Sequence, residues 1–254
     1  MMHQIRLFFI ALQFFTRIPI PSWVGFEAAW LNQASRYFPA VGWVVGLVTA
    51  TVFGLASLVL PQLVAVVLST VAGIMLTGAF HEDGFADICD GFGGGMTPER
   101  VLEIMKDSRV GAYGAIGIGM MLLTKVSVLA SMPASYVIPA LLVAHPLSRL
   151  ASCSLIFLMD YARLEGKAKP LAQHMSGLEL VVACATVFLP ALALFYAQLL
   201  PLKNLLLGAI LLCLASWWLA RLFKRRIAGY TGDCLGAVQQ LSEVAFYLGL
   251  CSFI

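Results

Sequence analysis

The stretch QLVAVVLSTVAGIMLTGAF (62–80) contains no charged residue and leads directly into HEDGFADICDG (81–91). The first part is long enough to cross the hydrocarbon core of a bilayer as a helix. The second part holds a histidine and four carboxylates, in a chain that has only 13 Asp and Glu residues. Such a cluster repels itself unless a positive group holds it, and a divalent metal ion is the simplest candidate.

The composition is typical of a polytopic membrane protein. Hydrophobic residues make up 61% of the chain, charged residues make up 11%, and the mean hydropathy is +0.91. Soluble domains are about one quarter charged. The stretches expected to span the membrane are 38–60, 62–80, 113–132, 136–159, 178–200 and 203–222. A seventh, 235–254, is weaker because Glu243 interrupts it. We therefore predict an all-α integral membrane helical bundle of six to seven transmembrane helices, forming one domain over residues 1–254.

The N-terminal stretch 5–24 is apolar but carries Arg6, Arg17, Pro19 and Pro21. These residues disfavour a membrane span, and no clear small-residue cleavage site follows the apolar part, as a signal peptide would require. We expect the stretch to lie at the membrane interface.

The alternation of these spans places 13 of the 16 basic residues on one side of the membrane. They are Arg6, Arg17, Arg36, Arg100, Lys106, Arg109, Arg163, Lys167, Lys169, Arg221, Lys224, Arg225 and Arg226. The opposite side has only Lys203, while Lys125 and Arg149 fall within spans. By the positive-inside rule, the acidic cluster and the connections 160–177 and 221–234 face the cytoplasm. Because topology alone requires these cations, the net charge of +3 gives no reason to expect a nucleic-acid partner.

Three of the clustered acids share one face of a helix. Asp83, Asp87 and Asp90 stand at i, i+4 and i+7, which places them within an arc of roughly 60° over about 10 Å of axis, while Glu82 points away. Hard oxygen ligands suit Mg²⁺ or Mn²⁺. The alternatives are a solvated acidic helix end, a structural metal site or an ion-conduction site. His81 could be a metal ligand, a general base or a hydrogen-bond donor to phosphate.

The helix that carries these acids is expected to end in the glycine-rich stretch 91–95, because glycine disfavours a helix interior. The next helix should begin with Thr97 as its N-cap and Pro98 in its first turn.

Two further connections carry groups suited to phosphate. Lys106 and Arg109 bracket an acid just before a span, which indicates a phosphate clamp or ordinary cytoplasmic anchors. In the stretch 229–232 the glycines let backbone N–H groups approach a phosphate, and the following Asp233 could complete a metal site. A simple turn between two spans explains this second connection equally well.

Four ionisable residues fall within the spans. His145 and Arg149 lie at i, i+4 on one helix face, and Lys125 and Glu243 lie on two other spans. Such groups are costly in lipid and are expected to face the bundle interior, where internal ion pairing would satisfy them.

Five motifs, taken in order, resemble those of the cobalamin synthase family. They are FFTRIP (14–19), FPAVG (38–42), HEDGFADICDG (81–91), KDSRVG (106–111) and GYTGDCLGA (229–237). Each motif alone is modest, but five in register over residues 14–237 are highly specific. Glu82 departs from the family pattern, because many relatives are apolar at that position. This departure agrees with the helical geometry that turns Glu82 away from the other acids.

The resemblance implies an enzyme, adenosylcobinamide-GDP ribazoletransferase, in the bacterial cytoplasmic (inner) membrane. It would join adenosylcobinamide-GDP to α-ribazole or α-ribazole 5′-phosphate, release GMP and require Mg²⁺. The implied metal ligands are Asp83, Asp87, Asp90 and Asp233. Lys106 and Arg109 would hold the pyrophosphate, and His81 or Asp107 would accept the proton of the attacking hydroxyl. The implied substrate-binding residues are Arg17, Gly229, Tyr230, Thr231 and Gly232. Membrane lipid surrounds such a protein, and a homo-oligomer or a complex with other cobalamin-pathway enzymes is a further expectation.

Two other functions compete with this interpretation. A CDP-alcohol-type membrane phosphotransferase also places aspartates on helices, but its motif needs Ala-Arg where this chain has Ala86-Asp87. A divalent-cation transporter would place acids near the bilayer midplane, where Glu243 is the main candidate.

Overall fold

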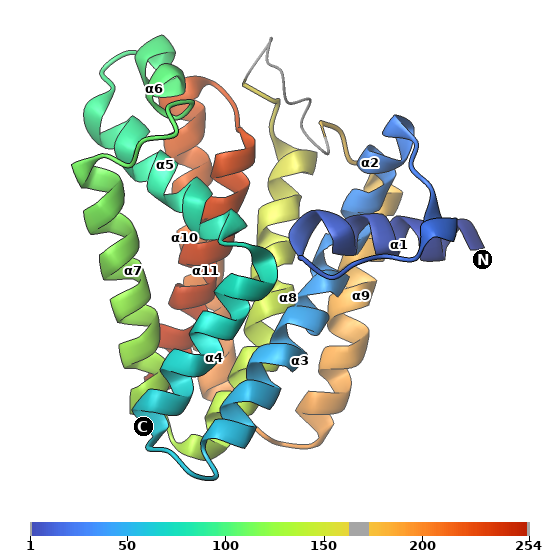
Figure 1. Cartoon of the computed structure of the whole chain (residues 1–254), viewed down its shortest axis with the longest axis vertical. Helices are drawn as coiled ribbons and strands as arrows, with labels where there is room; N and C mark the ends of the chain where they lie inside the picture. Colours follow the sequence, from blue (N-terminus) through green and yellow to red (C-terminus); the bar gives the residue numbers. More distant parts are fainter. Residues whose placement is uncertain (1, 163–172, 253–254) are drawn as a thin grey trace.

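The computed structural model describes residues 2–162 and 173–252, and within these the regular secondary structure is helical apart from one isolated β-bridge. The helices are α1 (Met2–Phe15), α2 (Ala28–Ala34), α3 (Phe38–Ala56), α4 (Gln62–Thr77), α5 (Phe80–Gly94), α6 (Pro98–Ile104), α7 (Ala112–Ser131), α8 (Ala134–Leu158), α9 (Gly177–Tyr196), α10 (Leu202–Ile227) and α11 (Gly232–Cys251). The short 3₁₀ helices Ser22–Val24 and Ser35–Tyr37 flank α2. Figure 1 shows an upright bundle with α1 lying across it and α6 at one end.

Most of the predicted spans are confirmed as helices. Helices α3, α7, α8, α10 and α11 are long and apolar enough to cross a membrane, and α4 with α5 adds a sixth if this bent pair counts as one span. Helix α11 qualifies despite Glu243. The expected span 178–200 forms α9, whose described apolar part, Gly177–Ala193, is shorter than the others. The chain is therefore a multi-pass helical membrane protein.

The helix in the expected span 62–80 ends earlier than expected, at Thr77, because the chain turns by 90° between α4 and α5. Gly78 and Ala79 both adopt the left-handed conformation, with φ of 66° and 59°, and a helix cannot continue through it. The Arg17 side chain packs against the turn, where a Cβ on Gly78 would meet its Nε at 2.7 Å. The Arg17 backbone N–H also donates to the Leu76 carbonyl at 2.8 Å. The turn redirects α5 away from the axis of α4.

The helix after this turn is longer than expected. Helix α5 runs on through Gly91 and Gly93 to Gly94, although glycine lowers helix stability. A Cβ on Gly91 would clash with Met105, and one on Gly93 would clash with the Tyr113 ring. These glycines therefore allow α6 and α7 to pack closely on α5, which offsets their poor helix propensity. The start of α6 is as expected, since Thr97 Oγ1 accepts from the Arg100 backbone N–H.

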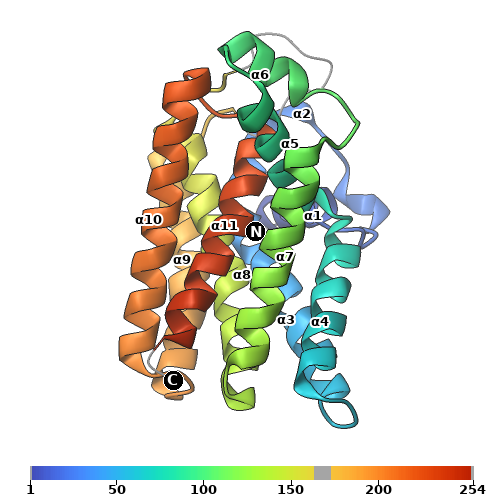
Figure 2. The ribbon, with the colours of Figure 1, turned by 90° about the vertical axis from the view of Figure 1, so that its left-hand side faces the viewer.

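The central helix of the bundle is α11, which packs against α5, α7, α8 and α10. Figure 2 shows it between α10 and α7. Helix α6 and the C-terminal end of α10 lie at one end of the bundle, and the first turn of α10, with Lys203, lies at the other (Figure 1). This placement agrees with the expected charge asymmetry. The predicted cytoplasmic residues Arg163, Lys167 and Lys169 lie outside the described residues.

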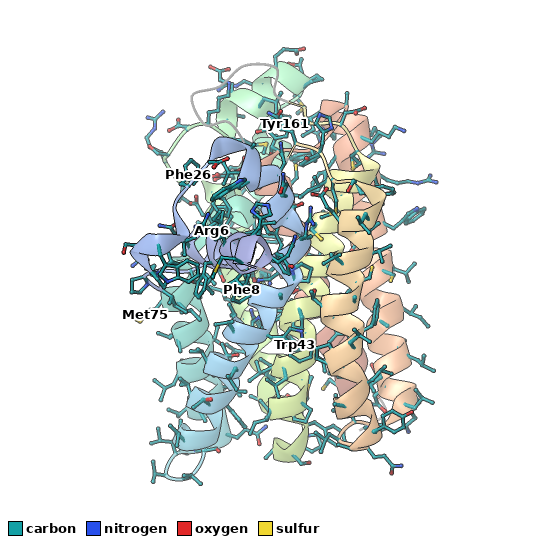
Figure 3. All side chains as sticks on the ribbon, turned by 90° about the vertical axis from the view of Figure 1, so that its right-hand side faces the viewer. Arg6, Phe8, Phe26, Trp43, Met75 and Tyr161 are labelled. Atoms are coloured by element: carbon teal, nitrogen blue, oxygen red, sulfur yellow. The ribbon has the colours of Figure 1, made fainter. Side chains whose placement is uncertain are left out.

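The N-terminal helix α1 crosses the outside of the bundle (Figure 3). It is not among the described helices that are long and apolar enough to span a membrane. Arg6 stacks over the Trp30 ring at 5.7 Å, and the Phe15 ring stacks on His81 at 5.4 Å. Helix α1 therefore supports the start of α5 through Phe15, and its position at the membrane interface stays a prediction.

A buried ion pair at the core confirms the expected internal pairing. Glu243 on α11 is fully buried, and its Oε1 lies 2.6 Å from Lys125 Nζ on α7. Its Oε2 lies 3.3 Å from His145 Nδ1 on α8 and accepts from Gln239 Nε2 at 2.6 Å. The Tyr247 hydroxyl lies 3.1 Å from Oε1. Four side chains thus surround one buried carboxylate, which reduces its cost in lipid.

Two more buried charges, Arg149 and Glu82, lie beside this ion pair. Arg149 Nη1 donates to the His145 carbonyl at 3.0 Å, and Glu82 Oε1 accepts from Gln240 Nε2 at 2.8 Å. Both charges line a small cavity of about 20 Å³, together with His81. The lining of this cavity therefore contains two carboxylates, Glu82 and Glu243, and two cations, Lys125 and Arg149, whose formal charges cancel.

We expect Lys125→Met to lower stability by about 3–5 kcal/mol, because it leaves the Glu243 carboxylate buried without its cation. The double variant Lys125→Met/Glu243→Gln should lose less than the sum of the single variants. Thermal unfolding in a fixed detergent or lipid measures both. Arg100→Met, which breaks the exposed Arg100–Glu103 pair, is the control and should cost about 0–1 kcal/mol. If the double variant loses as much stability as the two single variants together, the proposed coupling between Lys125 and Glu243 is contradicted.

Candidate active site

Helix α5 has an acidic face and a buried face. Asp83 is exposed and Asp87 is half-buried, whereas His81 and Glu82 are buried. The bond from Gln240 holds Glu82 against α11, so Glu82 points into the bundle as the helical geometry predicted. The acidic face starts at the turn between α4 and α5, where Arg17 also lies.

Helix α11 brings a fourth aspartate to this face. A Cβ on Gly84 would lie 3.0 Å from Asp233 Cα, and one on Gly236 would lie 3.1 Å from the His81 carbonyl oxygen. The backbones of α5 and α11 therefore touch, and Asp233 at the start of α11 lies beside the first turns of α5. The positive end of the α11 dipole is at the same place, which favours a negatively charged ligand there.

Asp90 has a structural contact that the sequence did not suggest. Its carboxylate accepts from the backbone N–H of Gly111 at 2.7 Å and from that of Gly114 at 2.8 Å. A Cβ on either glycine would clash with this carboxylate. Asp90 therefore fastens the start of α7, and the loop before it, to α5.

The loop that Asp90 fastens carries the predicted phosphate clamp. Lys106 and Arg109 are exposed, and Arg109 Nη2 and Nε donate to Asp107 at 2.6 and 3.0 Å. Hydrogen bonds from Arg109 lower the pKa of Asp107 to about 2. Arg109 is therefore already bound to the exposed Asp107 carboxylate. An incoming phosphate would have to displace this carboxylate to bind Arg109.

The glycine-rich connection 229–232 serves mainly as structure. The Tyr230 side chain is fully buried, and its backbone pairs with the segment around Tyr161. Burial raises the pKa of Tyr230, and a Cβ on Gly229 would clash with the Asp160 carbonyl. Thr231 caps α11 by accepting from the Cys234 N–H at 3.4 Å. Gly232 is the one residue of this connection with open space beside its backbone, because a Cβ there would meet nothing within 4 Å.

The described side chains include no group of three or more His, Cys, Asp or Glu already gathered for a metal ion. Mg²⁺ does not need such a group, because it usually takes one or two carboxylates and completes its shell with water and substrate phosphates. Asp83 and Asp87 on one helix face, with Asp233 nearby, fit this requirement. Asp90 fits it less well, because both of its oxygens already accept backbone hydrogen bonds.

Sequence reasoning missed Arg226 as a residue that shapes this site. Its Nη2 donates to the carbonyls of Phe92 and Gly95 at 3.2 and 2.6 Å, and its guanidinium lies 5.1 Å from the centroid of the Phe92 ring. It thereby satisfies carbonyls at the C-terminal end of α5. In the sequence Arg226 is one of several cations closing a span, and no signal separated it from its neighbours.

Comparison with known proteins places the chain in a family. The family model described as cobalamin-5-phosphate synthase matches residues 7–251. The chain belongs to this family. A relative from Shewanella frigidimarina, named adenosylcobinamide-GDP ribazoletransferase, is 46% identical over 97% of this chain and 94% of its own length. One of the same name from Ralstonia pickettii is 48% identical over 96% of this chain and 94% of its own length. No solved structure matches the chain.

In this cobalamin-5-phosphate synthase family member, we expect Asp90→Ala to free the loop before α7, because the Gly111 and Gly114 amides lose their acceptor. Hydrogen exchange at these two amides should accelerate by at least about tenfold, since a charge-assisted hydrogen bond contributes about 1.5–3 kcal/mol. Glu103→Ala, on α6, is the control and should leave both amides protected. Unchanged exchange in Asp90→Ala would contradict the anchoring role.

We expect Arg109→Met to raise the pKa of Asp107 from about 2 toward its ordinary 3.8, because the guanidinium hydrogen bonds are lost. In the unmodified protein the bridge persists at neutral pH and breaks only as the pH falls through about 2, the pKa of the bridged Asp107. A carboxyl-carbon NMR titration of Asp107 measures this shift. Arg100→Met should leave the titration unchanged, and an Asp107 that titrates near 4 before mutation would contradict the bridge.

Proposed function

We propose that this protein is the membrane transferase that joins adenosylcobinamide-GDP to α-ribazole, or to α-ribazole 5′-phosphate, with release of GMP. The names of the relatives at 46% and 48% identity support the reaction. The observation that carries the proposal for this chain is the meeting of the 81–91 and 229–237 motifs, where the backbone of α5 touches that of α11. The meeting gathers acidic groups and a helix N-terminus at one end of the bundle. We further propose that this end faces the cytoplasm of a bacterial inner membrane.

The chemistry is a substitution at phosphorus. A ribazole hydroxyl oxygen bonds to the pyrophosphate phosphorus on the corrinoid side, and the bond from that phosphorus to the GMP oxygen breaks. GMP leaves as the anion, and the hydroxyl proton passes to a base. Such a transfer needs charge neutralisation and alignment more than covalent help. The exposed acidic face of α5 and the cations of the 106–109 loop are suited to those two tasks.

Magnesium is the proposed cofactor, with Asp83, Asp87 and Asp233 as its protein ligands and Asp90 as a further candidate. When bound, the ion would neutralise the pyrophosphate and the leaving GMP. Lys106 and Arg109, in the loop between α6 and α7, would bind phosphate oxygens. Arg17 and the open backbone at Gly232 are the proposed substrate contacts that the geometry favours, whereas the burial of Tyr230 favours a packing role.

The proton acceptor is proposed to be Asp107 rather than His81. The His81 ring is buried and stacked on Phe15, and it lines the interior cavity rather than the open acidic face. Asp107 lies in the exposed loop, but its pKa of about 2 makes it a weak base while Arg109 holds it. A phosphate that draws Arg109 away would raise the pKa of Asp107 and free it to accept the proton. Substrate binding would thus prepare the base.

The first test is GMP release by the purified protein in lipid, given adenosylcobinamide-GDP with α-ribazole or its 5′-phosphate, with and without Mg²⁺. Release that needs both an acceptor and the metal supports the transferase, and the faster acceptor identifies the natural one. A well-folded sample that releases no GMP under any of these conditions would overturn the proposal.

The aspartate roles are tested by Asp83→Asn and Asp87→Asn. We expect each to lower kcat/KM by more than about 100-fold, the usual cost of losing a group that stabilises transition-state charge, and to raise the Mg²⁺ concentration needed. Glu103→Gln changes one exposed carboxylate on the neighbouring helix α6 and should leave both values unchanged. Full turnover by Asp87→Asn at limiting Mg²⁺ would rule out its role as a metal ligand.

A further inference from the structure

Helix α10 has an outer face with an apolar part and a cationic part. Leu206, Ile210 and Leu214 are each more than half exposed, as are Trp217 and Trp218. Three exposed cations follow on the same side of the helix: Arg221, Lys224 and Arg225. At 100° per residue, the two tryptophans and three cations fall within an arc of about 120°. We call these five residues the Trp-cation patch.

The spacing along α10 suits a lipid surface. The helix rises about 24 Å between Leu202 and Trp218 at 1.5 Å per residue, which is most of the ~30 Å hydrocarbon core. Trp217 and Trp218 therefore lie at the level where tryptophans mark the membrane interface. Arg221, Lys224 and Arg225 then lie at the level of the phospholipid headgroups. Arg221 stacks over the Trp217 ring at 4.6 Å, which fixes its guanidinium at this boundary.

The cations of this patch differ from three other cations near the same end of the bundle. Arg36 pairs with Glu179, Arg100 with Glu103, and Arg109 with Asp107. Within the described residues, no carboxylate forms an ion pair with Arg221, Lys224 or Arg225, and α10 itself contains no Asp or Glu. The patch therefore has three positive charges that the described fold does not neutralise.

The patch also borders open space that a headgroup could fill. An open hollow of about 620 Å³ is lined by both tryptophans, Leu222 and the three cations. Leu214 and Ile210 are exposed on the same side of α10, toward its N-terminal end, where an acyl chain would lie along them. An occupant must be anionic at one end and apolar at the other.

We propose that the Trp-cation patch is a binding site for an anionic phospholipid with a phosphate-glycerol headgroup. The three cations bind the phosphate and favour an anionic lipid over a zwitterionic one. The tryptophans pack against the glycerol region of the lipid. The site lies on the outer face of α10 and does not depend on the transferase reaction.

The test is quenching of tryptophan fluorescence by bromine-labelled lipids, with the whole protein in phosphatidylcholine vesicles that contain a small fraction of phosphatidylglycerol. We expect labelled phosphatidylglycerol to quench several-fold more than labelled phosphatidylcholine at an equal mole fraction. Because one basic residue near an anionic surface contributes about 1 kcal/mol, Lys224→Gln should lower the preference about fivefold at low salt. Arg100→Gln removes one cation outside the patch and should leave the preference unchanged.

Two further variants make the result decisive. Trp217→Phe/Trp218→Phe should abolish the excess quenching, which locates it to this patch. Arg221→Gln/Lys224→Gln/Arg225→Gln should quench equally with both lipids while keeping the thermal unfolding temperature of the unmodified protein. Equal quenching by both lipids in the unmodified protein, or a preference that survives the triple substitution, would overturn the proposal. Loss of GMP release with lipid preference intact would count against the transferase alone.

Discussion

The contact between α5 and α11 is the constraint on which the candidate site depends. Gly84 and Gly236 let the two backbones touch, and a side chain at either position would press on Asp233 or His81. Because α11 also packs on α7, α8 and α10, it is a fixed support for the acidic helix. The turn between α4 and α5 then aims that helix along α11. Two motifs far apart in the sequence thereby form one surface.

The same central helix carries the main electrostatic cost of the fold. Glu243 is fully buried in a bundle whose surroundings are lipid, so its charge must be balanced inside the protein. Lys125 on α7 and His145 on α8 contact its carboxylate, and the opposite charges of Arg149 and Glu82 line the same cavity. Each pairing joins different helices, so that electrostatic neutrality requires the helices to assemble. Because Glu243 is already paired inside the protein, it suits a structural role better than the ion-binding role that a cation transporter would require.

The carboxylates of the 81–91 motif fall into two groups, one exposed for the proposed chemistry and one engaged in packing contacts. Asp83 and Asp87 remain on the outer face, whereas Glu82 and Asp90 are engaged in holding α11 and the α7 loop. Helical spacing correctly placed three aspartates on one side and turned Glu82 inward. It could not assign Asp90, because the amides that Asp90 binds belong to residues 21 and 24 positions later. A local pattern identifies the face of a residue, and the tertiary contact decides what the residue does there.

The sequence by itself determined the helical membrane class, most of the spans, the buried pairing and the family. These follow from local hydropathy, periodicity, charge cost in lipid and motif order, all of which are readable along the chain. Only the tertiary structure decided the 90° turn, the passage of α5 through its glycines and the interior position of His81. Each of these depends on a neighbour distant in sequence: Arg17 packs at the turn, Met105 requires Gly91, and Phe15 covers the histidine. A single chain does not reveal such partners until it is folded.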